Sequence, residues 1–179
     1  MGKGYLYEPT EPRDEMIFTD AVNYGVLVDY TISGDLFIEI FADRQANQIK
    51  NRAGNYVFPV ASLDIFTDYY HAGIGYRSLS LGGIFFFGGT LGITNIIPRE
   101  GDIKSEQFFS FGPFVGFEAQ ISEILALRAH SRFLLTTMNG NNGILESPDG
   151  PVFYFKETTL IQMDFTLGIV FYLAGTGYY

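Results

Sequence analysis

The last long segment of the chain, residues 160–173, alternates between two kinds of side chain. The odd positions are all large and apolar: Ile161, Met163, Phe165, Leu167, Ile169, Phe171 and Leu173. The even positions are mixed: Leu160, Gln162, Asp164, Thr166, Gly168, Val170 and Tyr172. Because successive side chains of a β-strand point to opposite faces, this period of two predicts one long strand with two chemically different faces.

Six upstream segments alternate in the same way, and a shorter strand is expected near 4–8, which gives eight predicted strands. The six segments are 22–32, 36–45, 70–78, 85–95, 109–120 and 125–136. The predicted tight turns are at 33–35, 80–83 and 122–123, and the predicted long connections are 9–17, 46–62, 96–106 and 138–156. Short turns at one rim and long loops at the other are typical of outer-membrane barrels. An even strand count places both termini at the rim of the short turns.

The mixed row of each predicted strand decides which face points inward. It is rich in glycine and includes the large residues Phe37, Phe41, Phe86 and Phe114. The four lysines, Lys3, Lys50, Lys104 and Lys156, lie outside the predicted strands. Small residues beside large ones fill a narrow barrel interior, whereas an uninterrupted apolar row suits a lipid-facing band. The alternative is a soluble barrel such as a lipocalin, in which the apolar row points inward.

The expected fold is therefore all-β: a closed antiparallel up-and-down transmembrane β-barrel of about eight strands, formed as a single domain by residues 1–179. No apolar run reaches the roughly 20 residues that a transmembrane helix needs. Pro113 lacks a backbone N–H, so a bulge or bend is expected at Gly112 and Pro113. The N-terminus has no apolar segment of the signal-peptide kind, which predicts that an export signal is encoded upstream of Met1.

Charged side chains and histidines gather on the predicted inward row. They are Asp29, Glu39, Asp43, His71, Arg77, Glu118, Arg128, His130, Arg132 and Asp164. Charges in so narrow a barrel should pair, because an unpaired buried charge is costly. We interpret the set as a structural salt-bridge network that plugs the lumen. A narrow gated pore or a pocket for one small ligand is the alternative interpretation.

The residues give no catalytic, metal or cofactor site. His130 and Ser131 are adjacent, so their side chains point to opposite faces of a strand and cannot act as a base and a nucleophile together. The glycine-rich segment 88–92 is not followed by a predicted helix, which a phosphate-binding loop requires. The chain has no cysteine, and its net charge of −9 argues against a nucleic-acid partner.

Three stretches resemble the small eight-stranded bacterial outer-membrane β-barrel proteins: 24–30, 68–77 and 109–116. The last strand is similar to the signal that the outer-membrane assembly machinery reads in this family. It matches at Thr166, Gly168, Phe171 and Leu173, although six residues follow here and the family usually ends at the aromatic position. The resemblance implies a location in the Gram-negative outer membrane. The implied partners are membrane lipids, lipopolysaccharide and the assembly machinery.

Three functions remain open at this point. The first is a non-enzymatic structural or surface-interaction role, in which the long loops meet lipids or a protein partner. The second is a narrow, porin-like channel or carrier for a small solute. The third and least favoured is a lipid-modifying enzyme. The acidic residues Glu8, Glu11, Asp14, Glu15 and Asp20 in or beside the first long loop suggest a solvated loop or contact with divalent cations at a lipopolysaccharide surface.

Overall fold

The computed structural model of the protein describes residues 4–5, 15–19, 21–52, 62–80, 82–99, 105–138, 144–145, 153–154 and 158–173. The long strands are β3 (Asn23–Ser33), β4 (Leu36–Arg52), β5 (Ser62–Ser80), β6 (Gly83–Pro98), β7 (Glu106–Ser122), β8 (Leu125–Met138) and β11 (Thr158–Phe171). The short strands are β1 (Gly4–Tyr5), β2 (Glu15–Phe18), β9 (Ile144–Leu145) and β10 (Phe153–Tyr154). The described residues contain no helix long and apolar enough to span a membrane.

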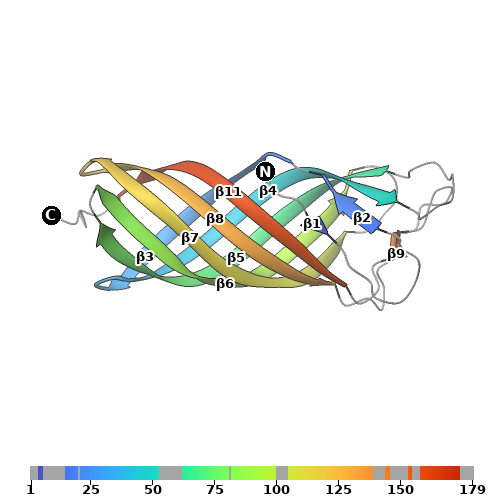
Figure 1. The fold of residues 1–179 in the computed structure, drawn as a ribbon, viewed down its shortest axis with the longest axis horizontal. Helices are drawn as coiled ribbons and strands as arrows, with labels where there is room; N and C mark the ends of the chain where they lie inside the picture. The colour runs from blue at the N-terminus through green and yellow to red at the C-terminus, as the bar shows by residue number, and fades with distance from the viewer. Residues whose placement is uncertain are drawn as a thin grey trace.

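Nine of the described strands form one antiparallel sheet that curves into a barrel (Figure 1), and β9 and β10 form a separate two-stranded sheet. Neighbours in the sheet run in the order β2-β1-β11-β8-β7-β6-β5-β4-β3, and a further pairing joins β2 to β4. That pairing closes the ring at the end where β1 and β2 lie, and β3 continues from β2 along the same edge of β4. The expected fold, an up-and-down barrel with consecutive strands paired, is confirmed.

Tight turns gather at one end of the barrel. They join β3 to β4, β5 to β6 and β7 to β8, as the sequence predicts, and the C-terminal end of β11 lies at the same end (Figure 1). Gly34 and Gly82 have φ angles of 50° and 97° in two of these turns. Residues with a side chain rarely adopt this left-handed conformation, so glycine is favoured at both positions. The Tyr172 N–H donates to the Ile124 carbonyl and ties the end of β11 to the third turn.

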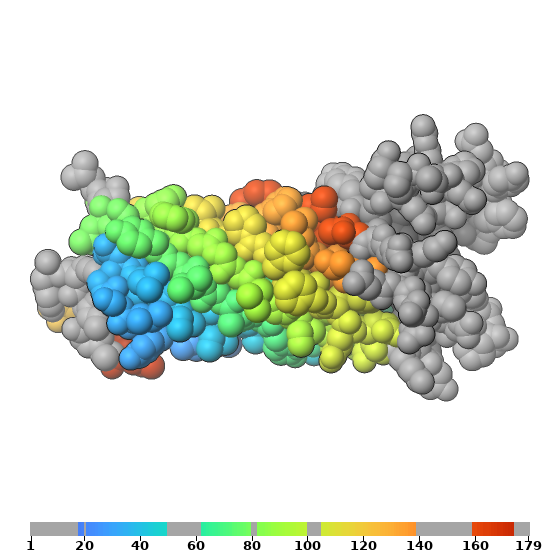
Figure 2. Space-filling view, turned by 90° about the horizontal axis from the view of Figure 1, so that it is seen from below, coloured from blue at the N-terminus to red at the C-terminus, as the bar shows by residue number. Residues whose placement is uncertain are grey.

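Burial follows the predicted faces. On β8 every inward side chain from Ala126 to Met138 is buried, whereas outward Leu127 is 51% exposed. The same alternation along the other strands leaves an outer wall dominated by Val, Ile, Leu, Phe and Tyr. Figure 2 shows one face of the barrel, on which the atoms of the described strands form a continuous surface. The mixed row faces the lumen and the apolar row faces outward.

Several strands are longer than predicted, which corrects the boundaries of the long connections. β4 runs to Arg52 and pairs with β5 as far as Lys50 and Ser62, so much of the predicted loop 46–62 is ladder. β6 extends to Pro98, and β2 and the β9–β10 pair occupy parts of 9–17 and 138–156. Backbone hydrogen bonds hold these extensions together even where a polar side chain such as Gln48 interrupts the apolar row. Lys50, placed outside the strands by the sequence, therefore lies in β4.

The bulge expected at Pro113 is absent. On β7 and β8, Phe111 pairs with Leu135 and Phe114 with Arg132, so the register is the same on both sides of the proline. Between these two pairs, Gly112 and Pro113 have no ladder partner on β8, where proline has no N–H to donate. The register shifts in the described strands lie between Thr31 and Ser33 and between Gln120 and Ser122, next to tight turns.

Candidate functional site in the barrel lumen

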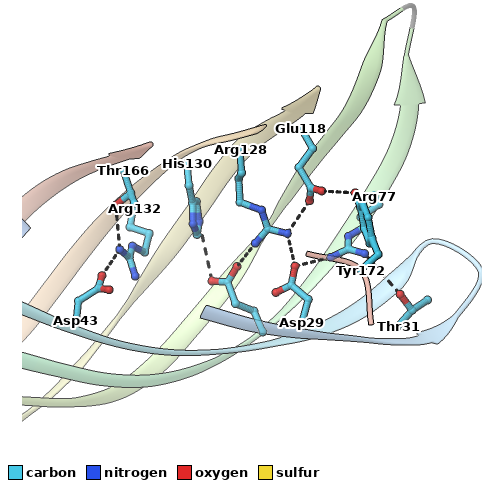
Figure 3. A network of polar contacts seen from close by, with 11 residues as sticks. Asp29, Thr31, Asp43, Arg77, Glu118, Arg128, His130, Arg132, Thr166 and Tyr172 are labelled. Carbon is cyan, nitrogen blue, oxygen red and sulfur yellow. Dashed lines mark hydrogen bonds and ion pairs between the residues drawn. The ribbon is translucent and has the colours of Figure 1, made fainter. Parts of the chain in front are cut away.

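Arg128 lies at the centre of a charged layer near the tight turns (Figure 3). Glu118 is its direct cross-strand partner on β7, and Nη2 of Arg128 is 2.6 Å from Oε1 of Glu118. Asp29 on β3 pairs with the same guanidinium group, and Nη1 lies 3.7 Å from Oε2 of Glu39 on β4. One guanidinium group thus faces carboxylates from three strands, which is the geometry that a buried charge requires.

The same layer extends to Arg77 and Tyr172. Arg77 on β5 pairs with Asp29, which therefore bridges two guanidinium groups. The Tyr172 hydroxyl, just beyond the end of β11, donates to Glu118 over 2.7 Å. Burial and this hydrogen bond raise the pKa of the Tyr172 hydroxyl, so tyrosine remains a neutral donor there. Tyr172 covers the charged layer on the side of the tight turns (Figure 3).

Arg132 lies two inward positions further along β8 and forms a second ionic layer. Its direct cross-strand partner on β11 is Asp164, with 2.6 Å between Nη2 and Oδ2, and it also pairs with Asp43 on β4. Asn23 on β3 donates to Asp164 over 2.6 Å. The guanidinium carbon lies 3.9 Å from the ring centroid of Phe41, a cation–π contact.

Glu39 and His130 lie between these layers. Glu39 is fully buried, and its Oε1 is 3.9 Å from Nε2 of His130. Within the described residues neither oxygen of Glu39 has a hydrogen-bond partner, so its stabilisation comes from nearby charges. His130 is enclosed by the rings of Phe86 and Phe114, at centroid distances of 5.4 and 5.3 Å. Glu39 therefore depends more than the other carboxylates on the arginine beside it.

Three phenylalanines form an aromatic layer in the middle of the charges. The ring centroids of Phe37, Phe86 and Phe114 lie 6.1 to 6.4 Å apart. Glycines provide the space: a Cβ on Gly75 would lie 2.5 Å from the Phe37 ring, and one on Gly116 would lie 2.1 Å from the Phe86 ring. The mixture of Gly and Phe in the inward row is thus a packing arrangement, as expected for a narrow interior.

Toward the long loops the lumen becomes uncharged. Nε2 of His71 is 2.7 Å from the Ser110 hydroxyl, which also accepts from the Thr94 hydroxyl over 2.8 Å. Tyr69 donates to Gln162, which in turn donates to Gln45. An apolar cluster closes this end: Phe18, Ile49, Ile65, Ile96, Phe108, Met138 and Leu160. No sequence motif predicted this cluster, although nearly all of its residues continue the inward rows of the alternating segments.

All ten side chains predicted for the lumen lie on inward rows, but they do not form one network. The structure brings Asp29, Glu39, Arg77, Glu118, Arg128 and His130 together in one group. Arg132 with Asp43 and Asp164 forms a second group, and His71 belongs to the uncharged layer instead. The described residues contain no group of three or more His, Cys, Asp or Glu side chains that could hold a metal ion.

Comparison with known proteins identifies a fold and no close relative. No family model matches the chain, and no curated protein matches it. The crystal structure of the outer membrane protein OprG from Pseudomonas aeruginosa is similar, with a TM-score of 0.51 over 95% of this chain and 92% of that chain. The two sequences are 11% identical. The chain therefore has the fold of an outer-membrane β-barrel protein, and the similarity says nothing further about its activity.

Proposed function

We propose that this chain is a structural or surface-interaction protein of the Gram-negative outer membrane. In this proposal its lumen is plugged by side chains, and its long loops meet lipids, lipopolysaccharide or a protein partner. The observation that carries the proposal is the filling of the lumen along its length. Charged, aromatic, uncharged polar and apolar layers follow one another from the tight turns to the loop end. A barrel of about eight strands has an interior just wide enough for side chains to fill.

The ionic layers support a plug rather than a conducting pore. Arg128 and Arg132 are each at least 95% buried and each pairs with at least two carboxylates. Carboxylates on several strands pair with each guanidinium group. Moving the guanidinium group off the barrel axis would leave these buried carboxylates unpaired, which is costly. The apolar cluster from Phe18 to Leu160 would also have to open before ions could pass.

A non-enzymatic role is supported by the surroundings of the one buried serine–histidine pair described above. Ser110 is fully buried and His71 is 3% exposed, so no substrate reaches the Ser110 hydroxyl. The second ring nitrogen of His71, Nδ1, has no hydrogen-bond partner among the described residues, whereas an activated nucleophile requires a base that a third group orients. We therefore assign this pair to packing of the lumen.

The proposed membrane partners are supported by the outer wall and by the last strand. Outward Phe171 and Leu173 are exposed, as lipid-facing residues would be, whereas Thr166 and Gly168 belong to the inward row. This division fits an assembly signal that displays its aromatic and apolar positions on the outer face. Of the acidic residues in the first long loop, only Glu15 lies within the described residues.

The purified protein is expected to be electrically silent in a planar lipid bilayer, because the ionic layers and the apolar cluster block the axis. The measurement is single-channel current after reconstitution, with correct folding verified by circular dichroism of the same sample. An Arg128→Ala sample serves as a comparison in which one ionic layer is disrupted. Discrete current steps from the unmodified protein, altered in size by Arg128→Ala, would contradict the plug and favour a pore.

A further inference from the structure

Two arginines meet at one phenylalanine on the outer wall. Arg44 on β4 and Arg99 just after β6 continue the outward rows of their strands, and every other arginine side chain that the structure describes lies in the lumen. Their guanidinium carbons are 5.0 and 4.9 Å from the ring centroid of Phe66 on β5. Each contact has the geometry of a cation–π interaction. The arginine charge described on the outer wall is therefore concentrated at this ring.

The two arginines differ in their carboxylate partners. Nε and Nη2 of Arg44 donate to the two carboxylate oxygens of Asp68, over 2.6 and 2.7 Å. The Tyr70 hydroxyl donates to the same carboxylate over 3.4 Å. A guanidinium group held by two parallel hydrogen bonds is fixed in orientation, and its charge is matched. Arg44 therefore neutralises Asp68 and packs against one side of Phe66.

Arg99 has no carboxylate within ion-pairing distance among the described residues, unlike each of the other described arginines. The Arg99 N–H donates to the carbonyl oxygen of Asp64 over 2.9 Å, so these two residues are neighbours on adjacent strands. The Asp64 carboxylate instead accepts from Nε2 of Gln48, on the opposite side of β5, over 2.9 Å. The exposed Arg99 side chain thus keeps its donors for an external anion, while Phe66 holds the guanidinium group in place.

This arginine pair lies where the apolar band of the outer wall ends. The outward row of β4 is apolar from Leu36 to Ala42, and Arg44 is its next member. Tyr24 is the cross-strand partner of Arg44, and Tyr70 is the partner of Ala42. Both tyrosines are exposed on the outer wall, and outward aromatic residues of membrane barrels gather at the membrane–water interfaces. The position therefore matches the boundary between hydrocarbon and lipid headgroups.

The length of β6 gives the depth of Arg99. From Leu91, in the middle of β6, to Arg99 the chain rises roughly 20 Å along the membrane normal, at about 3.3 Å per residue and a strand tilt of about 40°. The hydrocarbon core ends about 15 Å from the bilayer centre, and the headgroups extend to about 20–22 Å. With Leu91 at the centre, Arg99 lies among the headgroups. This is the extracellular leaflet in the usual orientation of such barrels, because the tight turns lie at the opposite end.

We propose that Arg99, held on Phe66, binds a phosphate group on the lipid A anchor of lipopolysaccharide. Phosphate oxygens match the fork of a guanidinium group, and phosphates lie at the depth of Arg99. The chain carries a net charge of −9, so an anionic headgroup needs a local cation to approach the wall. The proposal rests on the proposed function, which brings lipopolysaccharide to the barrel, and it names the residues that make the contact.

The test titrates the folded protein in uncharged detergent micelles with lipid A, with dephosphorylated lipid A and with inorganic phosphate. Arg99→Gln is expected to weaken lipid A binding about tenfold, the effect of losing a hydrogen bond to a charged group. Phe66→Leu keeps every charge but removes the ring that holds Arg99, so a smaller loss is expected. Neither variant is expected to change the binding of dephosphorylated lipid A. Resistance of each sample to SDS without heating verifies folding.

A double variant separates a built site from general attraction by charge. Arg99→Gln combined with Gln107→Arg keeps the net charge and moves the arginine to β7, two strands away from Phe66. Gln107 is exposed on the outward row, and the register sets it at the level of Arg44. The double variant is expected to bind lipid A as weakly as Arg99→Gln alone. Full recovery of binding would show that any cation at this end of the wall suffices, and it would overturn the site.

The remaining outcomes separate this site from the proposed function. Lipid A binding that is equal for Arg99→Gln and the unmodified protein would overturn the site and leave contact with lipopolysaccharide standing. Inorganic phosphate that binds as tightly as lipid A would identify a free-anion site and overturn the lipid as ligand. If the folded, unmodified protein does not bind lipid A, both the site and the proposed contact with lipopolysaccharide are wrong.

Discussion

Replacing Arg128 by alanine is expected to lower the free energy of unfolding by about 3–5 kcal/mol, the usual cost of removing one partner of a buried ion pair. The substitution leaves Glu118 and Asp29 without this guanidinium group, and Glu39 loses the arginine nearest to it. It also removes the packing of the guanidinium group on the Phe86 ring, 4.8 Å from the ring centroid. The measurement is equilibrium urea unfolding of the protein in liposomes or detergent micelles.

Arg44→Ala is the matched control for this prediction. Arg44 also pairs with an aspartate, Asp68, but its side chain is 41% exposed and lies beyond residues 36–42, the apolar part of the outward row of β4. Exposed ion pairs contribute little, so a clearly smaller loss is expected. Combining Arg128→Met with Glu118→Gln and Glu39→Gln should recover part of the stability, because it neutralises two carboxylates that lose the arginine, while Asp29 keeps its pairing with Arg77. Equal losses for Arg128→Ala and Arg44→Ala would contradict a buried ionic plug.

Gly112→Ala is expected to destabilise the barrel strongly, at the upper end of the roughly 1–3 kcal/mol typical of overpacking. A Cβ at this position would lie 1.7 Å from the Phe133 carbonyl oxygen on β8. That atom is backbone, so relief requires β7 and β8 to separate beside Pro113, where the ladder already lacks its pairs. The fraction of heat-resistant folded protein after refolding, together with urea unfolding, measures the effect.

Gly168→Ala provides the comparison on another inward row, since a Cβ there meets nothing within 4 Å. It is expected to fold in the same yield as the unmodified chain. If the two variants fold in equal yield, β7 and β8 do not approach as closely at Gly112 as the register requires.

The faces of the strands could be predicted from the sequence because they depend on a local property. The alternation in 160–173 assigns Ile161 outward and Asp164 inward whatever the strand pairs with. Strand ends could not be predicted in the same way. The ladder between β4 and β5 runs past Gln45 and Asn47 because backbone groups find partners across the hairpin, and side-chain hydropathy does not report this.

Which lumen residues contact one another depends on the strand register as well as on the inward rows, so the alternation alone could not predict it. The sequence placed ten charged or histidine side chains inward, but only the pairing of β8 with β7 and β11 sets Arg128 opposite Glu118 and Arg132 opposite Asp164. The same applies to His71, which contacts Ser110 two strands away instead of the carboxylates.

A single tryptophan at Leu91 tests the central claim, that the outward row meets lipid, most directly. The chain has no tryptophan, and Leu91 is 59% exposed in the middle of β6. Ile124→Trp, in a tight turn and 66% exposed, is the control for a position outside the hydrocarbon core. In liposomes of brominated lipid, strong quenching is expected at position 91 and weak quenching at position 124. Quenching of the tryptophan at position 91 by aqueous acrylamide, but not by brominated lipid, would contradict a lipid-facing outward row. Water would then surround the barrel wall.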